Sequence, residues 1–310
     1  MRVIEDVRNC DAVFENLVLT IGSFDGVHCG HVAILDSVVE RARAINGTPA
    51  LMTLHPHPRQ LFNPGGAPNI LTPLPEKQAL VAERGIEVFY ILPFMPEVAA
   101  LDPNAFLERI IVERCHTHTL IVGHDFAFGK GAKGDYEFLK DAAPAYGIVV
   151  ERVPALYIQG ERVGSTVIRE RIIQGELDKV EVLLGRKYAI VGEVVRGRGI
   201  GGRKLGYPTA NIKPHNSAVP AHGVYVAEVL VDGARRQAAV NIGIAPTILQ
   251  EDVTIEAFIL DFDENIVGRD IQIIFHRRVR PEKKYDSLDE LIRAIEQDVA
   301  AVRAYFAERG

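Results

Sequence analysis

The sequence contains little cysteine, no tryptophan and no long apolar run. Its three cysteines, Cys10, Cys29 and Cys115, are far apart among 310 residues, so their spacing indicates neither a disulfide framework nor a zinc ribbon. Free thiols are typical of a reducing compartment, so we expect a cytoplasmic protein. No apolar run approaches the roughly 20 residues that cross a membrane, and the first eleven residues lack a signal-peptide core. We therefore expect no membrane partner.

The charge balance is mildly acidic, with 35 basic and 41 acidic residues and a formal net charge of −6. This balance argues against a protein that coats nucleic acid, and we expect no nucleic-acid partner. A composition of 47% hydrophobic and 25% charged residues is typical of a globular protein. The length allows two domains that each bury a core. The oligomeric state is not determined by these numbers, and a weak homo-oligomer stays open.

The first half of the chain alternates β-rich runs with amphipathic helical stretches. Asp102 before Pro103 predicts a helix start, and Gly85 and Gly147 predict helix ends. Nearly continuous apolar strands separated by helices predict a doubly wound parallel sheet, which binds ligands at the carboxyl ends of its strands. The expected strands cover residues 17–21, 50–54, 88–92, 120–122 and 148–153.

From residue 187 the pattern changes to strands joined by short polar turns, including the hairpin signal Asp232-Gly233. This pattern predicts a small antiparallel barrel or sandwich, followed by a long amphipathic helix that begins at Ser287. We place the join between the two domains in a helical connector at residues 165–186. The expected strands cover residues 188–195, 223–231, 237–241, 253–260 and 271–275.

The most informative motif is Gly-Ser-Phe-Asp-Gly-Val-His-Cys-Gly-His at residues 22–31, directly after the first expected strand. A strand that enters a glycine-rich turn and then a helix directs backbone N–H groups toward one position, where the helix dipole favours an anion. His28 and His31 are three residues apart and share one side of the first helical turn. This combination indicates a phosphate-binding turn, whereas a lone His-x-x-His would indicate ordinary surface histidines.

This segment resembles the Gly-x-Phe-Asp-Gly-x-His-x-Gly-His signature of prokaryotic FAD synthetases, within the wider His-x-Gly-His nucleotidyltransferase superfamily. The resemblance implies adenylyl transfer from ATP, which requires the charge on the α-phosphate to be screened. It implies catalytic roles for His28 and His31. It also implies ATP or phosphate contacts from Gly22, Phe24, Asp25 and Gly26.

A second segment, residues 164–169, contains groups suited to the leaving pyrophosphate. Ser165 and Thr166 can cap a helix N-terminus, and Arg169 can donate two N–H groups to a phosphate. By itself the segment fits an N-capped helix with a surface arginine equally well. It resembles the family's Ile-Ser-Ser-Thr-Arg-Ile-Arg, which implies phosphate contacts from Ser165 and Thr166 and a catalytic Arg169. Gly164 and Val167 depart from that pattern and remove a hydroxyl and a positive charge.

Two further segments, residues 53–58 and 123–131, resemble the flavin and nucleotide walls of the same family. In the second segment, Ala127 stands where arginine is common. The alternative interpretation is that the phenylalanines of this segment belong to the hydrophobic core. The resemblance implies flavin contacts from His57, Asp125, Phe126 and Phe128.

A second group of motifs lies in the expected β domain. Residues 197–202 match Gly-x-Gly-x-x-Gly, but Pro208 and Pro214 exclude the helix of a Rossmann motif, and no Walker Gly-Lys-Ser/Thr follows. The remaining interpretation is that these residues form a glycine-rich flap of the β domain. Thr209 and Asn211 then offer hard neutral oxygens suited to Mg²⁺ shared with ATP phosphates, although a lone Thr-Ala-Asn is more often a turn.

Residues 202–211 closely resemble the riboflavin kinase signature, including its Pro-Thr-Ala-Asn core. The resemblance implies that Glu256 is the catalytic base, because a primary hydroxyl that attacks a γ-phosphate must lose its proton. Alternation places Glu256 on the strand face of Phe258 and Leu260, an unusual position for a carboxylate without a function or partner. ATP or phosphate contacts are implied for Gly197, Gly199, Lys204, Thr209 and Asn211, with Thr209 and Asn211 also holding the metal.

The resemblance extends from about residue 18 to residue 305 and implies a bifunctional riboflavin kinase and FMN adenylyltransferase. Residues 1–185 would form the nucleotidyltransferase domain, and residues 186–310 an antiparallel β-barrel kinase domain with a long terminal helix. The implied substrates are riboflavin, FMN and ATP with Mg²⁺, and the products include FMN, FAD and pyrophosphate. Two alternatives stay open: a riboflavin kinase whose adenylyltransferase half is degenerate, and a non-catalytic flavin-binding regulator.

Overall fold

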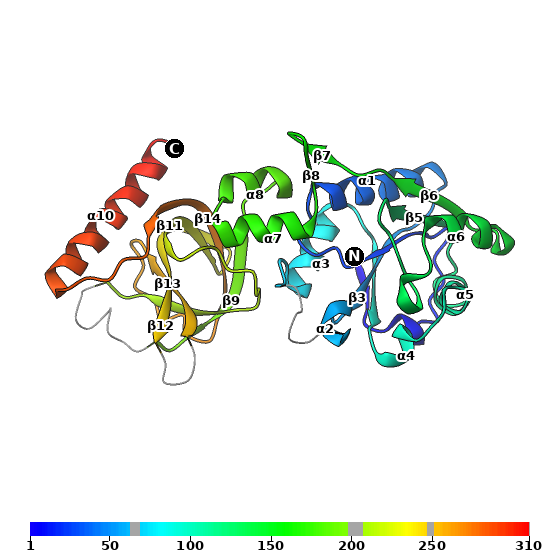
Figure 1. Ribbon diagram of the computed structural model, residues 1–310, viewed down its shortest axis with the longest axis horizontal. Helices are drawn as coiled ribbons and strands as arrows, with labels where there is room; N and C mark the ends of the chain where they lie inside the picture. The colour runs from blue at the N-terminus through cyan, green and yellow to red at the C-terminus, as the bar shows by residue number, and fades with distance from the viewer. Residues whose placement is uncertain (63–68, 198–206, 247–250, 310) are drawn as a thin grey trace. The chain divides into compact units, whose positions relative to one another are not determined.

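The computed structural model describes residues 1–62, 69–197, 207–246 and 251–309, which form two compact units (Figure 1). Unit 1 comprises Met1–Pro68 and Leu74–Ser165, and unit 2 comprises Asn69–Pro73 and Thr166–Gly310. The change between the units along the chain falls at the start of the connector predicted from sequence. The assignment of residues 1–185 and 186–310 to two functional domains stays a prediction.

Unit 1 contains a parallel sheet of six strands in the order β1-β4-β3-β2-β5-β6. The five strands predicted from sequence are all present within one or two residues of their expected bounds. The edge strand β1 was missed because it has only three residues, two of them exposed. The strands are β1 (Arg2–Ile4), β2 (Val18–Gly22), β3 (Pro49–His55), β4 (Val88–Pro93), β5 (Thr119–Gly123) and β6 (Val149–Val153).

Helices cover both faces of this sheet, which confirms the doubly wound arrangement. Val18 of β2 belongs to one core cluster with Leu35 and Val38 of α1 (Cys29–Ala44), and α3 (Leu74–Glu83) contributes Val81 to it. The next residue along β2, Leu19, belongs to the opposite cluster. That second face is covered by α5 (Pro103–Phe106), the π-helix η3 (Leu107–Val112) and α6 (Tyr136–Ala142).

Short elements complete unit 1, and their ends follow the predicted capping residues. The Asp102 side chain accepts from Ala105 N–H at 2.9 Å at the start of α5, and Gly147 ends η5 with a left-handed φ of 73°. The remaining elements are η1 (Val7–Asn9), α2 (Pro58–Phe62), α4 (Pro96–Ala99), η4 (Lys130–Ala132), η5 (Ala143–Tyr146), β7 (Tyr157–Ile158) and β8 (Glu161–Arg162).

The strand order places β2 between β3 and β5, and the direction of winding reverses at this position. Loops that leave the carboxyl ends of β2 and β5 therefore diverge to opposite faces of the sheet. Such a switch point is the ligand-binding position of open α/β sheets. Both predicted glycine-containing loops of this unit, at residues 22–31 and 123–131, begin there.

Unit 2 contains a closed barrel of six antiparallel strands, so the choice between barrel and sandwich is resolved in favour of the barrel. Strand β10 closes it by pairing with β9 and β13. It was not predicted because it is short and two prolines border its sequence. The strands are β9 (Ala189–Val195), β10 (Ala210–Pro214), β11 (Gly223–Val231), β12 (Ala234–Pro246), β13 (Glu251–Ile259) and β14 (Asp270–Pro281).

The Asp232-Gly233 hairpin is confirmed, since these two residues alone join β11 to β12 with φ values of 48° and 80°. Both values are positive, as a tight turn matched to strand twist requires. Three longer helices belong with the barrel along the chain: α7 (Ser165–Gln174), α8 (Leu177–Leu184) and α10 (Leu288–Ala307).

The long terminal helix α10 is also confirmed, and it packs on the outside of the barrel. Ser287 caps it by accepting from Glu290 N–H at 3.3 Å. Val302 and Tyr305 of α10 belong to one core cluster with Val226 of β11. Arg280 of β14 donates two hydrogen bonds, at 2.8 and 2.7 Å, to the buried carboxylate of Asp298.

Residues 69–73 also belong to unit 2, which the sequence did not indicate. Asn216 is 1% exposed and donates through Nδ2 to the Leu71 carbonyl at 2.6 Å. Ser217 Oγ accepts from Ile70 N–H at 2.6 Å. Hydrogen bonds from side chains to the backbone fix this irregular segment, because a buried backbone group without a partner would be unfavourable. Among the helices that the structure describes, none combines the length and apolar character of a membrane span.

Candidate functional site

The turn between β2 and α1 is built around a buried aromatic ring. Gly22 ends β2, and a side chain there would approach the Phe24 ring to 3.0 Å. Phe24 is 2% exposed and has a left-handed φ of 46°, so its ring packs in the core and only its backbone can face a ligand. Gly26, with φ of 93°, completes the reversal into the helix.

The two predicted histidines meet at the start of α1. Their rings stack with centroids 3.6 Å apart and an interplanar angle of 13°. His28 caps the helix, because its Nδ1 accepts from the His31 N–H at 3.2 Å. We assign the His28 proton to Nε2 for that reason, so Nε2 is the donor atom of this ring. The Phe24 ring lies 4.8 Å from that of His31.

Ser165 of the second predicted motif contacts this turn. Ser165 Oγ donates to the Asp25 carbonyl at 2.8 Å, and the Asp25 side chain is 2% exposed. Ser165 is the first residue of α7, and its hydroxyl binds the turn. Thr166 and Arg169 belong to unit 2, where Arg169 Nε donates to the Asn69 carbonyl at 2.6 Å. The phosphate roles of these two residues stay predictions.

A buried lysine beneath the turn was missed by the sequence analysis. Lys77 of α3 is 8% exposed, and its Nζ donates to the Ser23 carbonyl at 2.7 Å. Burial lowers its pKa to about 8, and the nearby Asp25 carboxylate opposes that shift. The available signal was spacing: Lys77 precedes the buried Val81 by four residues and thus shares its helix face. Burial and the Lys77 charge together lower the pKa of His55.

The residues predicted to contact flavin lie near the ends of β3 and β5. Phe128 is 8% exposed and packs against Phe106 and Phe138, so it belongs to the core. Phe126 is half-buried and stacks on Phe128 with centroids 5.4 Å apart. Asp125 is exposed and forms an ion pair of 2.6 Å with Arg162. In the β3 loop, the His57 N–H donates to Gln60 Oε1 at 3.1 Å.

The barrel carries a row of three polar residues on adjacent strands. Glu256 of β13 is paired in register with Asn211 of β10 on one side and with Asn241 of β12 on the other. The flanking residues Ile255 and Ala257 are buried in the barrel, so the row lies on its outer surface. Cross-strand neighbours on one face have side chains about 5 Å apart. Asn241 was not among the predicted site residues, because only the β12–β13 register brings it beside Glu256.

Gly197 lies directly beside Asn211: a β-carbon at residue 197 would overlap the Asn211 carboxamide and force it to move. Tyr207 precedes Thr209 and packs edge-on against Phe258, two residues beyond Glu256, with centroids 5.1 Å apart. Thr209 is half-buried just before β10. Gly199 and Lys204 lie outside the described residues. The Thr209 hydroxyl and the Asn211 amide are hard neutral oxygens, a donor set that fits Mg²⁺ when phosphates supply the charge.

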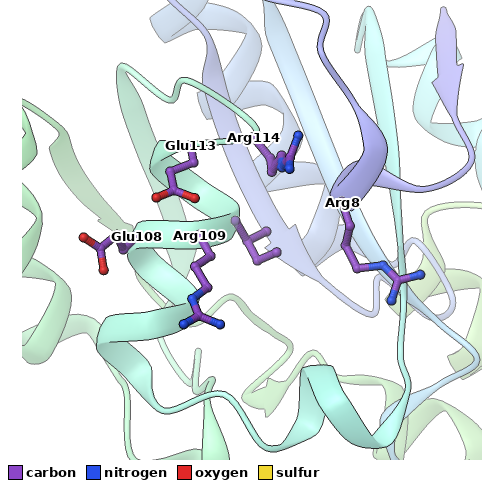
Figure 2. A pocket seen from close by; sticks show the side chains of 6 residues that line it. Arg8, Glu108, Arg109, Glu113 and Arg114 are labelled. Atoms are coloured by element: carbon purple, nitrogen blue, oxygen red, sulfur yellow. The ribbon is translucent and has the colours of Figure 1, made fainter.

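A pocket of about 450 Å³ in unit 1 contains none of the predicted site residues (Figure 2). Figure 2 shows Arg8 on one side and charged residues of η3 and of the turn that follows it on the other. Arg8 is already paired with Asp6, to which it donates at 2.9 and 2.7 Å, and this pairing lowers the Asp6 pKa. The pocket is lined by Arg8, Glu108, Arg109, Ile110, Glu113 and Arg114.

A parallel α/β unit with stacked histidines at its first strand–helix turn, joined to a barrel with an Asn-Glu-Asn row, defines a two-part transferase. Two family models match the chain: FAD synthetase over residues 10–167 and riboflavin kinase over residues 184–306. The chain belongs to the family of bifunctional riboflavin kinase/FMN adenylyltransferases.

Similar proteins cover nearly the full length. The bifunctional riboflavin kinase/FMN adenylyltransferase of Escherichia coli K12 is 36% identical, with 99% of this chain and 98% of that protein aligned. Its counterpart in Bacillus subtilis is 33% identical over 94% of this chain and 92% of its own length. A crystal structure described as a macrolide-efflux protein from Streptococcus pneumoniae has a TM-score of 0.85 and 27% identity, and covers 97% of this chain and 98% of its own. That comparison supports the fold.

Proposed function

We propose that this protein phosphorylates riboflavin to FMN and then transfers AMP from ATP to FMN, which yields FAD and pyrophosphate. The observation that carries the proposal is the match of two family models in one chain, one over each set of site residues. The substrates are riboflavin, FMN and ATP, with ATP used as its Mg²⁺ complex. The three free cysteines support the expected cytoplasmic location.

In the adenylyltransferase reaction, an FMN phosphate oxygen attacks the α-phosphate of ATP, and the bond to pyrophosphate breaks. The His28 Nε2–H and the His31 ring donate to phosphate oxygens and stabilise the charge that develops there. The turn formed by Gly22, Phe24, Asp25 and Gly26 supplies backbone N–H groups, which is consistent with its inward-facing Phe24 and Asp25 side chains. Ser165, Thr166 and Arg169 bind the leaving pyrophosphate.

In the kinase reaction, Glu256 accepts the proton of the riboflavin primary hydroxyl as that oxygen attacks the γ-phosphate, and ADP leaves. Asn211 and Asn241 flank the carboxylate and can fix its orientation through their amide groups. Thr209 and Asn211 would hold the Mg²⁺ that arrives with ATP, and this ion screens phosphate charge when bound. Gly197, Gly199 and Lys204 would contact the ATP phosphates.

The flavin of the adenylyltransferase site would contact His57, Asp125, Phe126 and Phe128. Burial divides the two phenylalanines: Phe126 has ring surface left for a ligand, whereas Phe128 supports it from the core. Asp125 would act from its ion pair with Arg162, which orients its carboxylate.

A second candidate is a riboflavin kinase without adenylyltransferase activity, favoured by the family departures at Gly164, Val167 and Ala127. A side chain at Gly164 would meet no atom within 4 Å, so the site has space for the hydroxyl that this chain lacks. At Gly164, the loss of the hydroxyl is therefore not compensated by another atom that fills its space.

A time course with purified protein, riboflavin, ATP and Mg²⁺ tests both candidates when flavins are separated by chromatography. We expect FMN to accumulate before FAD, because the departures weaken the second reaction. FAD without an FMN phase at saturating riboflavin would mean that the departures are compensated. FMN without any FAD would establish the kinase-only candidate, and neither product would leave only a flavin-binding protein.

A further inference from the structure

We propose that Lys77 is a positioning residue for FAD formation: its charged ammonium orients the Ser23–Phe24 peptide toward the nucleotide phosphates. The proposal rests on the adenylyltransferase function proposed above. Lys77 lies outside the sequence motifs of both family signatures, and it acts through the turn, without contacting the reacting atoms.

The geometry around Lys77 fixes one carbonyl group from two sides. Lys77 Nζ donates to the Ser23 carbonyl at 2.7 Å, and Thr53 Oγ1 of β3 donates to the same oxygen at 3.3 Å. Lys77 Nζ and Thr53 Oγ1 are themselves 3.5 Å apart. Lys77 is 8% exposed and Thr53 is fully buried, so water does not compete for this carbonyl.

This restraint determines where the next backbone donor points. A peptide group is planar and trans, so the Phe24 N–H is directed opposite to the Ser23 carbonyl and away from Lys77. Among the described residues, the Phe24 N–H has no hydrogen-bond acceptor. Phe24 has a left-handed φ of 46°, an unfavourable conformation for an aromatic residue that surrounding contacts must maintain. The result is a preoriented donor on the turn that carries His28.

The positive charge of Lys77 also favours phosphate binding at the turn directly. An ammonium ion in a low-dielectric region behind the turn makes the electrostatic potential of that turn more positive, which favours a polyphosphate. Among the described residues, the titratable groups coupled to Lys77 are the Asp25 carboxylate from the turn, which favours the ammonium, and the His55 imidazole from β3, whose pKa burial and the Lys77 charge lower. Burial lowers the Lys77 pKa to about 8 while Asp25 opposes the shift, so the ammonium is charged at neutral pH and neutral in mildly alkaline solution.

The test measures FMN-to-FAD and riboflavin-to-FMN rates of the full chain between about pH 6.5 and 9.5. Lys77→Met keeps the chain length but removes the charge, Lys77→Arg keeps the charge at every pH, and Lys140→Met is the matched control at an exposed lysine of unit 1. We expect the wild-type kcat for FAD formation to fall as pH rises through about 8, by up to about tenfold per pH unit.

Lys77→Met should lower the kcat of FAD formation by roughly 10- to 100-fold at pH 7 and remove the alkaline decline. Lys77→Arg should retain activity at pH 9 where the wild type has lost it. Riboflavin phosphorylation should change by less than about twofold in all three variants, since Glu256 and its neighbours belong to unit 2. If Lys77 only stabilised the fold, Lys77→Met would lower the rate of FAD formation but would leave its decline at alkaline pH in place.

The outcomes separate the two proposals. If the wild type forms FAD and Lys77→Met retains both its rate and its pH profile, the role of Lys77 is refuted while the adenylyltransferase function stands. If Lys77→Met does not fold, the other two proteins still test the role of Lys77. That role is refuted if the wild-type rate of FAD formation stays constant up to pH 9.5, or if the rate of Lys77→Arg still declines at alkaline pH. If the wild type forms no FAD at any pH, the proposed function fails and the role of Lys77 fails with it.

Discussion

Replacement of Glu256 by glutamine should remove riboflavin kinase activity and leave FAD formation from supplied FMN intact. Glutamine has the shape of glutamate and retains an amide oxygen and nitrogen for Asn211 and Asn241, which flank residue 256 in the β-sheet register. The residues on either side, Ile255 and Ala257, face the barrel core and are unaffected. The substitution therefore deletes the proposed base without disturbing the barrel.

The expected magnitude follows from that separation. Loss of a general base lowers a rate by about 10²- to 10⁴-fold, which corresponds to roughly 3–5 kcal/mol in activation free energy. If the Glu256 carboxylate only oriented its two asparagine neighbours, an amide of the same shape would keep part of those contacts, and the kinase rate would fall less. A decrease below about tenfold would therefore argue for orientation and against proton transfer.

The assay follows both reactions in the same protein sample by chromatography of the flavins. Glu193→Gln is the matched control, because Glu193 is an exposed glutamate on β9 of the same barrel. His28→Ala is the reciprocal variant: it should still form FMN but lose FAD formation, because the donor at the β2–α1 turn is absent.

The two-site interpretation is refuted if Glu256→Gln and His28→Ala each abolish both reactions in protein that remains folded by circular dichroism. It is also refuted for Glu256 if the glutamine variant phosphorylates riboflavin as fast as Glu193→Gln. Loss of only the predicted reaction in each variant would assign the two chemistries to separate sets of residues.

Four further predictions concern single contacts. Gly197→Ala should abolish riboflavin phosphorylation but not FAD formation from FMN, because the added β-carbon would displace the Asn211 carboxamide; steady-state assays of both reactions check this. Asp298→Asn should lower the free energy of unfolding of unit 2 by about 2–4 kcal/mol, because the Arg280 guanidinium loses its buried carboxylate partner. Denaturant unfolding followed by circular dichroism measures this, and an unchanged unfolding midpoint would contradict it. Burial lowers the Lys77 pKa from 10.5 to about 8, so between these pH values the unfolded chain holds a proton at Lys77 that the folded chain has released. The free energy of unfolding should therefore increase as pH rises from 8 to 10.5, and Lys77→Met should lack this increase. Melting temperatures of both proteins across that pH range test this. Calorimetry should detect no tight Mg²⁺ binding in the absence of nucleotide, because Thr209 and Asn211, the side chains proposed to hold the ion, are neutral; a stoichiometric heat would contradict this.

The sequence alone determined the features that depend on residues close together in the chain. Local periodicity and turn chemistry determine most strand positions, the cap at Asp102, the two-residue turn at Asp232-Gly233 and the amphipathic helix from Ser287. The stacking of His28 and His31 was also accessible, because residues three apart share one side of a helix.

Tertiary structure decided the features that depend on distant residues. Strand β10 gains its hydrogen bonds only from β9 and β13, so a short segment bordered by prolines gave no local signal. Asn241 neighbours Glu256 only through the β12–β13 register. Phe128 and Phe126 have the same local pattern, yet packing against Phe106 and Phe138 buries the first and leaves part of the second exposed.

Lys77 illustrates the physical reason most clearly. A lysine on a predicted helix is ordinarily a solvated surface residue, and nothing in its neighbouring sequence indicates a phosphate site. Its burial arises because the fold packs α3 under a turn more than fifty residues earlier in the chain, where the Ser23 carbonyl and Asp25 compensate the ammonium. Local sequence sets which groups are available, but desolvation and pairing, which set their charge and orientation, are properties of the folded chain.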